Sequence, residues 1–305
     1  MLADDGLTAG SKADFSAIYD RPDPRAYVRT LHALDYQVPQ QALPVFETVL
    51  RAMGAGAARP VLDVCCSYGI NAALLRCGVD LEQMHARYAD PALTGLSPDE
   101  LARADADFYA GRLTQPDRRV VGLDSARAPV DYALEVGLLD RGWAEDLESD
   151  EPSAGLAAGL ADVGLVICTG GVGYVGPATF ERILQSVRRP DELWLAVFVL
   201  RVFDYSAIAA TCARYGLVTE RLPGLTFAQR RFADQGERDA AYRDVTRRGL
   251  DPSGKEAAGW YHADCFLTRP PAAVQETPVG DVVQTLLRWT PAGAGGAGAR
   301  GQVQG

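Results

Sequence analysis

Long apolar runs are absent from this 305-residue sequence, and their absence excludes one class of protein. The longest run, LWLAVFVL at residues 193–200, has eight residues and is followed by Arg201. A helix needs about 20 apolar residues to cross a bilayer. The amino-terminal stretch MLADDGLTAGSKADFS is polar and acidic, unlike a secretory signal. We therefore expect no membrane partner and a cytoplasmic location.

Basic residues are also scarce. Lysine and arginine number 30 against 40 acidic residues, which gives a net charge of −10, and the only lysines are Lys12 and Lys255. An acidic surface repels the phosphate backbone of nucleic acids, so we expect no nucleic-acid partner. A small molecule is the expected substrate.

The six cysteines lack any spacing that is typical of a metal site or a redox motif. They are Cys65, Cys66, Cys77, Cys168, Cys212 and Cys265, without a C-x-x-C pair or a Cys/His ligand pattern. Several lie in stretches that we expect to be buried strands. The pattern indicates small buried side chains with reduced thiols, and no metal site is predicted.

Apolar strands alternate with amphipathic helices through the middle of the chain. The expected strands that start these units are residues 61–64, 119–124, 162–168 and 193–200. A helix is expected after each of them, for example at 129–140, where Pro129 suits a first turn. Two further strands are expected at 215–224 and 260–269. The order predicts an α/β fold with a doubly wound, seven-stranded, mostly parallel sheet.

The remaining segments surround this expected sheet. Residues 1–57 are predicted to be an N-terminal helical lid, and 58–270 the main domain. That domain has an insertion at 78–118, which would cover the site or contact a second copy in a homodimer. It also has an excursion at 226–258, whose alternating arginines and acids are typical of a solvated helix. Residues 271–305 form an extension, of which the Gly/Ala-rich 291–305 is expected to be disordered.

The turn after the first expected strand holds small residues at alternate positions. In VLDVCCSYGINAALL, Asp63, Cys65, Ser67 and Gly69 form the pattern acid-x-small-x-small-x-Gly. Ligands of doubly wound sheets lie at the carboxyl ends of the strands, where the strand order reverses. Small side chains at that turn would let a ligand lie against the backbone.

This stretch resembles the first motif of class I S-adenosylmethionine-dependent methyltransferases, which has glycines where Cys65 and Ser67 stand. The resemblance implies that Asp63, Cys65, Ser67 and Gly69 bind the methionine part and the ribose of S-adenosylmethionine. Asp124, at the end of RVVGLD, matches the acid that binds the ribose hydroxyls.

Two later segments extend the resemblance. In AEDLE, Asp146 matches the acid that accepts from the adenine amino group, and Leu147 would offer its backbone amide to the ring. DVGLVICTGGVGYVG matches the segment whose loop borders the reacting methyl group, which places Thr169 and Gly170 there. One feature departs from the usual pattern: Asp124 follows Asp63 by 61 residues, where this fold usually needs about 20. The extra residues form the insertion.

Methyl transfer needs mainly positioning and sometimes a base, and the sequence has no catalytic signature. Tyr19 and Tyr36, in the N-terminal segment, are predicted to contact the cofactor or acceptor. Tyr174 falls where the transferred methyl group is expected. His262 is a candidate base, with His32 as an alternative. A further histidine, His85, lies in the insertion, and Asn71 is expected to cap the helix after the loop.

Other functions remain open at this stage. GGVGYVG contains G-x-G-x-x-G at Gly171, Gly173 and Gly176, which suggests a nicotinamide cofactor, but the acid expected about 20 residues later is missing. A methyltransferase acting on a small molecule is the leading hypothesis. The runner-up is an aminocarboxypropyl transferase or a cyclase that releases methylthioadenosine from the same cofactor. A catalytically silent binding protein is a third.

Overall fold

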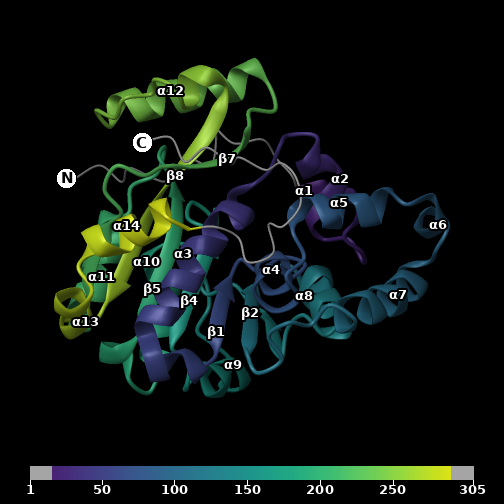
Figure 1. Cartoon of the computed structure of the whole chain (residues 1–305), viewed down its shortest axis with the longest axis horizontal. Coiled ribbons are helices and arrows are strands. Elements are labelled where there is room, and N and C mark those ends of the chain that lie inside the picture. The colour runs from purple at the N-terminus through teal and green to yellow at the C-terminus, as the bar shows by residue number, and fades with distance from the viewer. Residues whose placement is uncertain (1–15, 290–305) are drawn as a thin grey trace.

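The computed structural model describes residues 16–289, so the predicted disorder of 291–305 lies outside the described residues. Eight strands form one sheet in the order β3-β2-β1-β4-β5-β8-β6, and β7 also pairs with β8 (Figure 1). The strands are β1 (Val61–Val64), β2 (Val120–Asp124), β3 (Arg141–Ala144), β4 (Leu165–Thr169), β5 (Trp194–Leu200), β6 (Val218–Arg221), β7 (Phe227–Arg231) and β8 (Trp260–Arg269). The pairs among β1 to β5 are parallel, whereas β8 runs antiparallel to β5, β6 and β7. The predicted doubly wound, mostly parallel sheet is confirmed, and its order reverses between β1 and β4.

The sheet has eight strands where seven were predicted, and β3 and β7 were not located from the sequence. Strand β7 lies in the excursion where only a solvated helix was expected. Its charged residue Arg230 is buried by pairing with Glu237 of helix α12 (Gln235–Arg247), at 2.6 and 2.9 Å. The charges of such a buried ion pair alternate along the sequence in the same way as the charges of an exposed helix. The sequence pattern therefore did not distinguish the two. The helix expected at 129–140 is also shorter, since α8 ends at Glu135 and is followed by β3.

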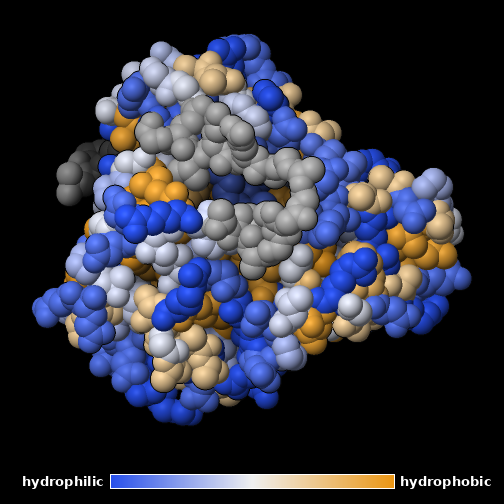
Figure 2. Space-filling model, viewed as in Figure 1, coloured by the Kyte–Doolittle hydropathy of each residue, from blue (hydrophilic) through white to orange (hydrophobic). Residues whose placement is uncertain are grey.

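Helices cover both faces of the sheet because strand side chains alternate between the faces. Val61 belongs to the apolar core beneath α3 (Val38–Met53), α4 (Ile70–Cys77), α8 (Arg127–Glu135) and α14 (Val279–Leu287). The next residue, Leu62, belongs to the core on the other face, beneath α9 (Ala154–Leu160), α10 (Pro177–Ser186) and α11 (Ser206–Arg214). Figure 2 shows mainly hydrophilic residues on the viewed face, with apolar residues in separate patches.

The insertion forms three helices that extend away from the sheet, as Figure 1 shows. They are α5 (Leu81–Ala89), α6 (Pro91–Thr94) and α7 (Pro98–Ala110). The N-terminal helices α1 (Ser16–Tyr19) and α2 (Arg25–His32) lie beside them, and α2 packs on α5. The Arg25 guanidinium joins the two segments by donating to the carbonyls of Leu93 and Leu96, each at 3.0 Å.

Short elements complete the described chain: η2 (Gly54–Ala58), η3 (Pro190–Glu192), η4 (Glu256–Ala258) and α13 (Pro271–Glu276). Among residues 16–289, no helix has the length and apolar character that crossing a bilayer requires.

Candidate functional site

The loop after β1 adopts the left-handed backbone conformation that glycine favours. Cys65 has φ of 59°, Ser67 has 48° and Gly69 has 76°. For residues with a Cβ this conformation costs about 1–2 kcal/mol each, so the surrounding contacts must hold it in place. One such contact comes from β2, where the Asp124 carboxylate accepts from the Ser67 N–H at 2.9 Å and from the Ala126 N–H at 3.0 Å. The fold therefore joins two of the residues predicted from the sequence, Ser67 and Asp124, although 57 positions separate them.

Asp63, at the end of β1, is fully buried. It accepts from the Asn71 side-chain amide at 2.9 Å, and the same amide lies 3.1 Å from the Thr169 hydroxyl at the end of β4. Asn71 thus links two strands and does not cap α4, whose N-cap is Gly69; the capping role predicted for Asn71 was wrong. The pKa of Asp63 is raised to about 7, mainly by burial; the hydrogen bond from Asn71 lowers it, and the charge of Asp124 adds to the rise.

The loop after β4 contacts the loop after β1 at the point where the strand order reverses. A Cβ added to Gly171 would lie 2.7 Å from the sulfurs of both Cys65 and Cys168, which makes glycine necessary there. A Cβ on Gly170 would lie 2.5 Å from the side-chain nitrogen of Gln229 in β7. Gln229 was not predicted as a site residue, because β7 was not predicted as a strand.

Four buried oxygen atoms at this junction have no hydrogen-bond partner among the described residues. They are Oδ2 of Asp63, Oγ of Ser67, Oδ1 of Asn71 and Oε1 of Gln229. Leaving buried acceptors unpaired costs about 1–3 kcal/mol each. A group rich in N–H donors or carrying positive charge would satisfy them.

Tyrosines from the N-terminal segment close over the loop. Burial raises the pKa of Tyr19 well above its usual value, and the nearby Tyr36, Tyr174, Asp124 and Cys65 raise it further. The structure therefore brings together five residues that the sequence analysis had singled out from four separate segments.

Side chains of the N-terminal segment lie beside the loop. The Tyr36 side chain is near those of Tyr27 and Thr169, and the Tyr27 side chain is near Ser67. Tyr68, which the sequence analysis left unassigned, has its hydroxyl 2.9 Å from the carbonyl oxygen of Tyr19. A residue inside the loop thus contacts the backbone of the N-terminal segment.

The segment after β3 holds the predicted adenine-binding residues. Asp146 is exposed and accepts from the Glu148 N–H at 2.9 Å, while Leu147 is buried. Glu148, which sequence reasoning missed, accepts from the Gly176 N–H at 2.7 Å and the Thr179 hydroxyl at 2.7 Å. The chain's own carboxylate therefore occupies the N-terminus of α10. This arrangement counts against binding of a dinucleotide pyrophosphate at the GGVGYVG turn.

His262, the candidate base, and Tyr174, which was predicted at the methyl site, differ in their exposure and their surroundings. Tyr174 is 59% exposed. His262, in β8, pairs with the Thr226 hydroxyl at 3.1 Å. Burial and the charges of Arg201 and Lys255 lower the pKa of His262 to about 4, so its imidazole is neutral at pH 7. The hydrogen-bond partner of His262 is therefore not one of Tyr19, Tyr36 and Tyr174.

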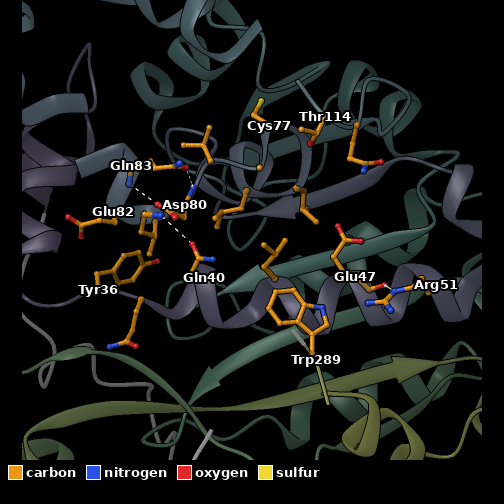
Figure 3. Close-up of a pocket in the computed structure, with 18 of the residues that line it drawn as sticks. Tyr36, Gln40, Glu47, Arg51, Cys77, Asp80, Glu82, Gln83, Thr114 and Trp289 are labelled. Atoms are coloured by element: carbon orange, nitrogen blue, oxygen red, sulfur yellow. Dashed lines mark hydrogen bonds between the residues drawn. The ribbon is translucent and has the colours of Figure 1, made fainter. Parts of the chain in front are cut away.

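A groove of about 1640 Å³, lined in part by Tyr36, lies between α3, the connection from α4 to α5, and α14. Figure 3 shows Tyr36 and Glu82 toward one end and Arg51 toward the other, with Trp289 between them. Since Tyr36 lines the groove and also lies near Thr169, it separates the groove from the loops.

Comparison with solved structures finds several S-adenosylmethionine-dependent methyltransferases. A TehB-like enzyme from Corynebacterium glutamicum is 15% identical with a TM-score of 0.34, covering 72% of this chain and 86% of that one. An enzyme from Aquifex aeolicus is 13% identical with a TM-score of 0.38, covering 85% and 100%. The plantazolicin methyltransferase BpumL, in complex with SAH, is 9% identical with a TM-score of 0.39, covering 81% and 91%. No model of a protein family matches the sequence, and no curated protein matches it. These likenesses are distant, so the function is argued from this chain's own residues.

Proposed function

We propose that this protein is an S-adenosylmethionine-dependent methyltransferase that acts on a small-molecule acceptor. The observation that carries the proposal is the loop after β1, in which Cys65 and Ser67 hold left-handed backbone and Asp124 binds the Ser67 N–H. That loop lies where the order of parallel strands reverses, which is the ligand position of a doubly wound sheet.

The polar groups present fit such a cofactor. The carboxylate of Asp124 accepts from the N–H groups of Ser67 and Ala126, and with about four acceptor sites it keeps capacity for a ribose hydroxyl. The free oxygens of Asp63 and Asn71 suit an ammonium group. A nearby cation would stabilise the charged form of Asp63 and so oppose the rise of its pKa.

The cofactor supplies an activated methyl group on a sulfonium, and the chain must position the acceptor and exclude water. We assign the positioning to Tyr36, which lines the groove, and to Tyr174, in the loop after β4. His262 remains a sequence-based candidate base, and its lowered pKa of about 4 makes it a weak proton acceptor at pH 7. The acidic chain favours a small acceptor over a nucleic acid.

The test is to incubate the purified protein with S-adenosylmethionine alone and to analyse the nucleosides by mass spectrometry. Tight binding with the cofactor intact, followed by S-adenosylhomocysteine when acceptor libraries are added, supports the proposal. Methylthioadenosine released without an acceptor would instead establish aminocarboxypropyl chemistry at the same site. Absence of binding would contradict both.

Changing both Cys65 and Ser67 to glycine is expected to leave affinity for S-adenosylmethionine unchanged or increase it. Glycine relieves the left-handed conformation at both positions, which offsets its entropic cost of about 0.5–1 kcal/mol. Calorimetric titration of the double variant measures the effect.

Cys66→Gly is the matched control, because Cys66 is buried and its φ is not positive. Its replacement is expected to lower the free energy of unfolding by about 1 kcal/mol or more. A collapse of cofactor binding in the double variant alone would mean that the Cys65 and Ser67 side chains themselves contact the ligand.

A further inference from the structure

Two histidines and a glutamate from separate helices meet on the surface beside the lid. His32 is the last residue of α2, and Glu82 and His85 lie on α5. One ligand atom from each lies within 4.8 Å of the others, and within residues 16–289 no other cluster of this kind is found. The two imidazole rings stack with their centres 3.2 Å apart and their planes 6° apart. Two of the three histidines of the whole chain are therefore in contact with each other.

The helix α5 presents its two ligands in a suitable arrangement. Glu82 and His85 are three residues apart, which places them on the same helix face. The start of α5 is fixed by a capping box in which Asp80 accepts from the Gln83 N–H at 2.7 Å. Figure 3 shows Glu82 beside this capped turn. The helix thus fixes the backbone that carries both groups, and the two stacked rings must rotate out of parallel before each can direct a ring nitrogen at one ion.

We propose that His32, Glu82 and His85 bind a divalent transition metal of the zinc type. Two imidazoles and a carboxylate are ligands that Zn²⁺ accepts, whereas Ca²⁺ and Mg²⁺ need six or more oxygen ligands. Because His32 and Glu82 are exposed, water completes the tetrahedral coordination. The sequence analysis predicted no metal site, because His32 and Glu82 are 50 positions apart and no ligand spacing reveals them.

The position of this site indicates its role. Helix α2 carries Tyr27, which lies near Ser67 of the candidate cofactor loop, and α2 packs on α5. A metal ion bound to His32 and to α5 would join the N-terminal lid to the insertion. The site would then stabilise the closed position of the lid without touching the loop. This inference does not depend on the proposed reaction.

The experiment titrates the chelator-treated, full-length protein with Zn²⁺ in competition with a chromophoric indicator. We expect one equivalent to bind and to raise the melting temperature. His32→Ala and His85→Ala should each weaken binding about 10-fold or more, since even outer-shell changes cost that much. Co²⁺ should give tetrahedral absorption bands in the wild type that the variants lack.

Glu82→Gln is expected to weaken binding, and Glu135→Gln, an exposed carboxylate on α8, is its matched control with unchanged affinity. The replaced side chains lie at the surface, so the variants should stay folded, within about 0.5 kcal/mol of wild type. Circular dichroism checks this. The proposal is overturned if the wild type takes up no Zn²⁺, or if His32→Ala combined with His85→Ala binds it with wild-type affinity, which would point to the cysteines.

Discussion

Asp124→Asn is expected to weaken binding of S-adenosylmethionine by about 10- to 100-fold. A hydrogen bond to a charged group contributes about 1.5–3 kcal/mol, and each 1.4 kcal/mol is a factor of ten. The asparagine also turns an N–H₂ group toward backbone N–H donors that the carboxylate now satisfies, at Ser67 and Ala126. The loop after β1 would therefore lose its contact with β2. Isothermal calorimetry on the folded variant measures the change.

The matched control is Asp131→Asn, an exposed carboxylate on α8 that faces Arg127. Its affinity for S-adenosylmethionine should equal that of the wild type. Thermal unfolding of both variants separates a loss of binding from a loss of fold. Wild-type affinity in a folded Asp124→Asn protein would remove the main support for the proposed cofactor.

Asp105→Ala is expected to lower the free energy of unfolding by about 3–5 kcal/mol, because it removes the carboxylate partner of the largely buried Arg87 and the acceptor of two buried tyrosine hydroxyls. Asp105 in α7 is fully buried and accepts from the Tyr132 hydroxyl at 2.6 Å and from the Tyr88 hydroxyl at 3.2 Å. It also pairs with the Arg87 side chain. These contacts connect the insertion to α8 of the main domain. Urea denaturation measures the change.

Asp107→Ala is the matched control, since it removes an exposed carboxylate two residues farther along the same helix. Surface substitutions usually stay within about 0.5 kcal/mol. If Asp105→Ala cost no more than this control, the buried network would not attach the insertion to the main domain.

Much of the fold could be predicted because its signals are local. Apolar strands alternating with helices indicated the parallel sheet, and the structure confirms it. Strand β7 was not predicted, because an arginine such as Arg230 is expected to be exposed when its partner is not known. The structure shows that Glu237 pairs with it. The short edge strand β3 escaped because RGWA is half-exposed and lacks an apolar pattern.

Some features of the candidate site could likewise be predicted from the sequence, and others could not. The positions of Cys65, Ser67 and Asp124 followed from one motif and one strand end, and the structure places Asp124 against the loop. Asn71 was read as a helix cap, whereas it contacts Asp63 and Thr169 from neighbouring strands. The roles proposed for Tyr174, Tyr36 and His262 stay predictions.

The amino-acid sequence by itself determined the order of strands and helices, the turn of small residues and the acidic character of the protein. These features depend on neighbours within a few residues, where side-chain period and backbone preference act. The tertiary structure alone placed Gln229 beside Gly170, Glu148 at the start of α10, and His32 beside His85. Such contacts join segments far apart in the chain, and packing of whole helices and strands sets them. The spacing of residues along the sequence does not predict which of these segments come into contact.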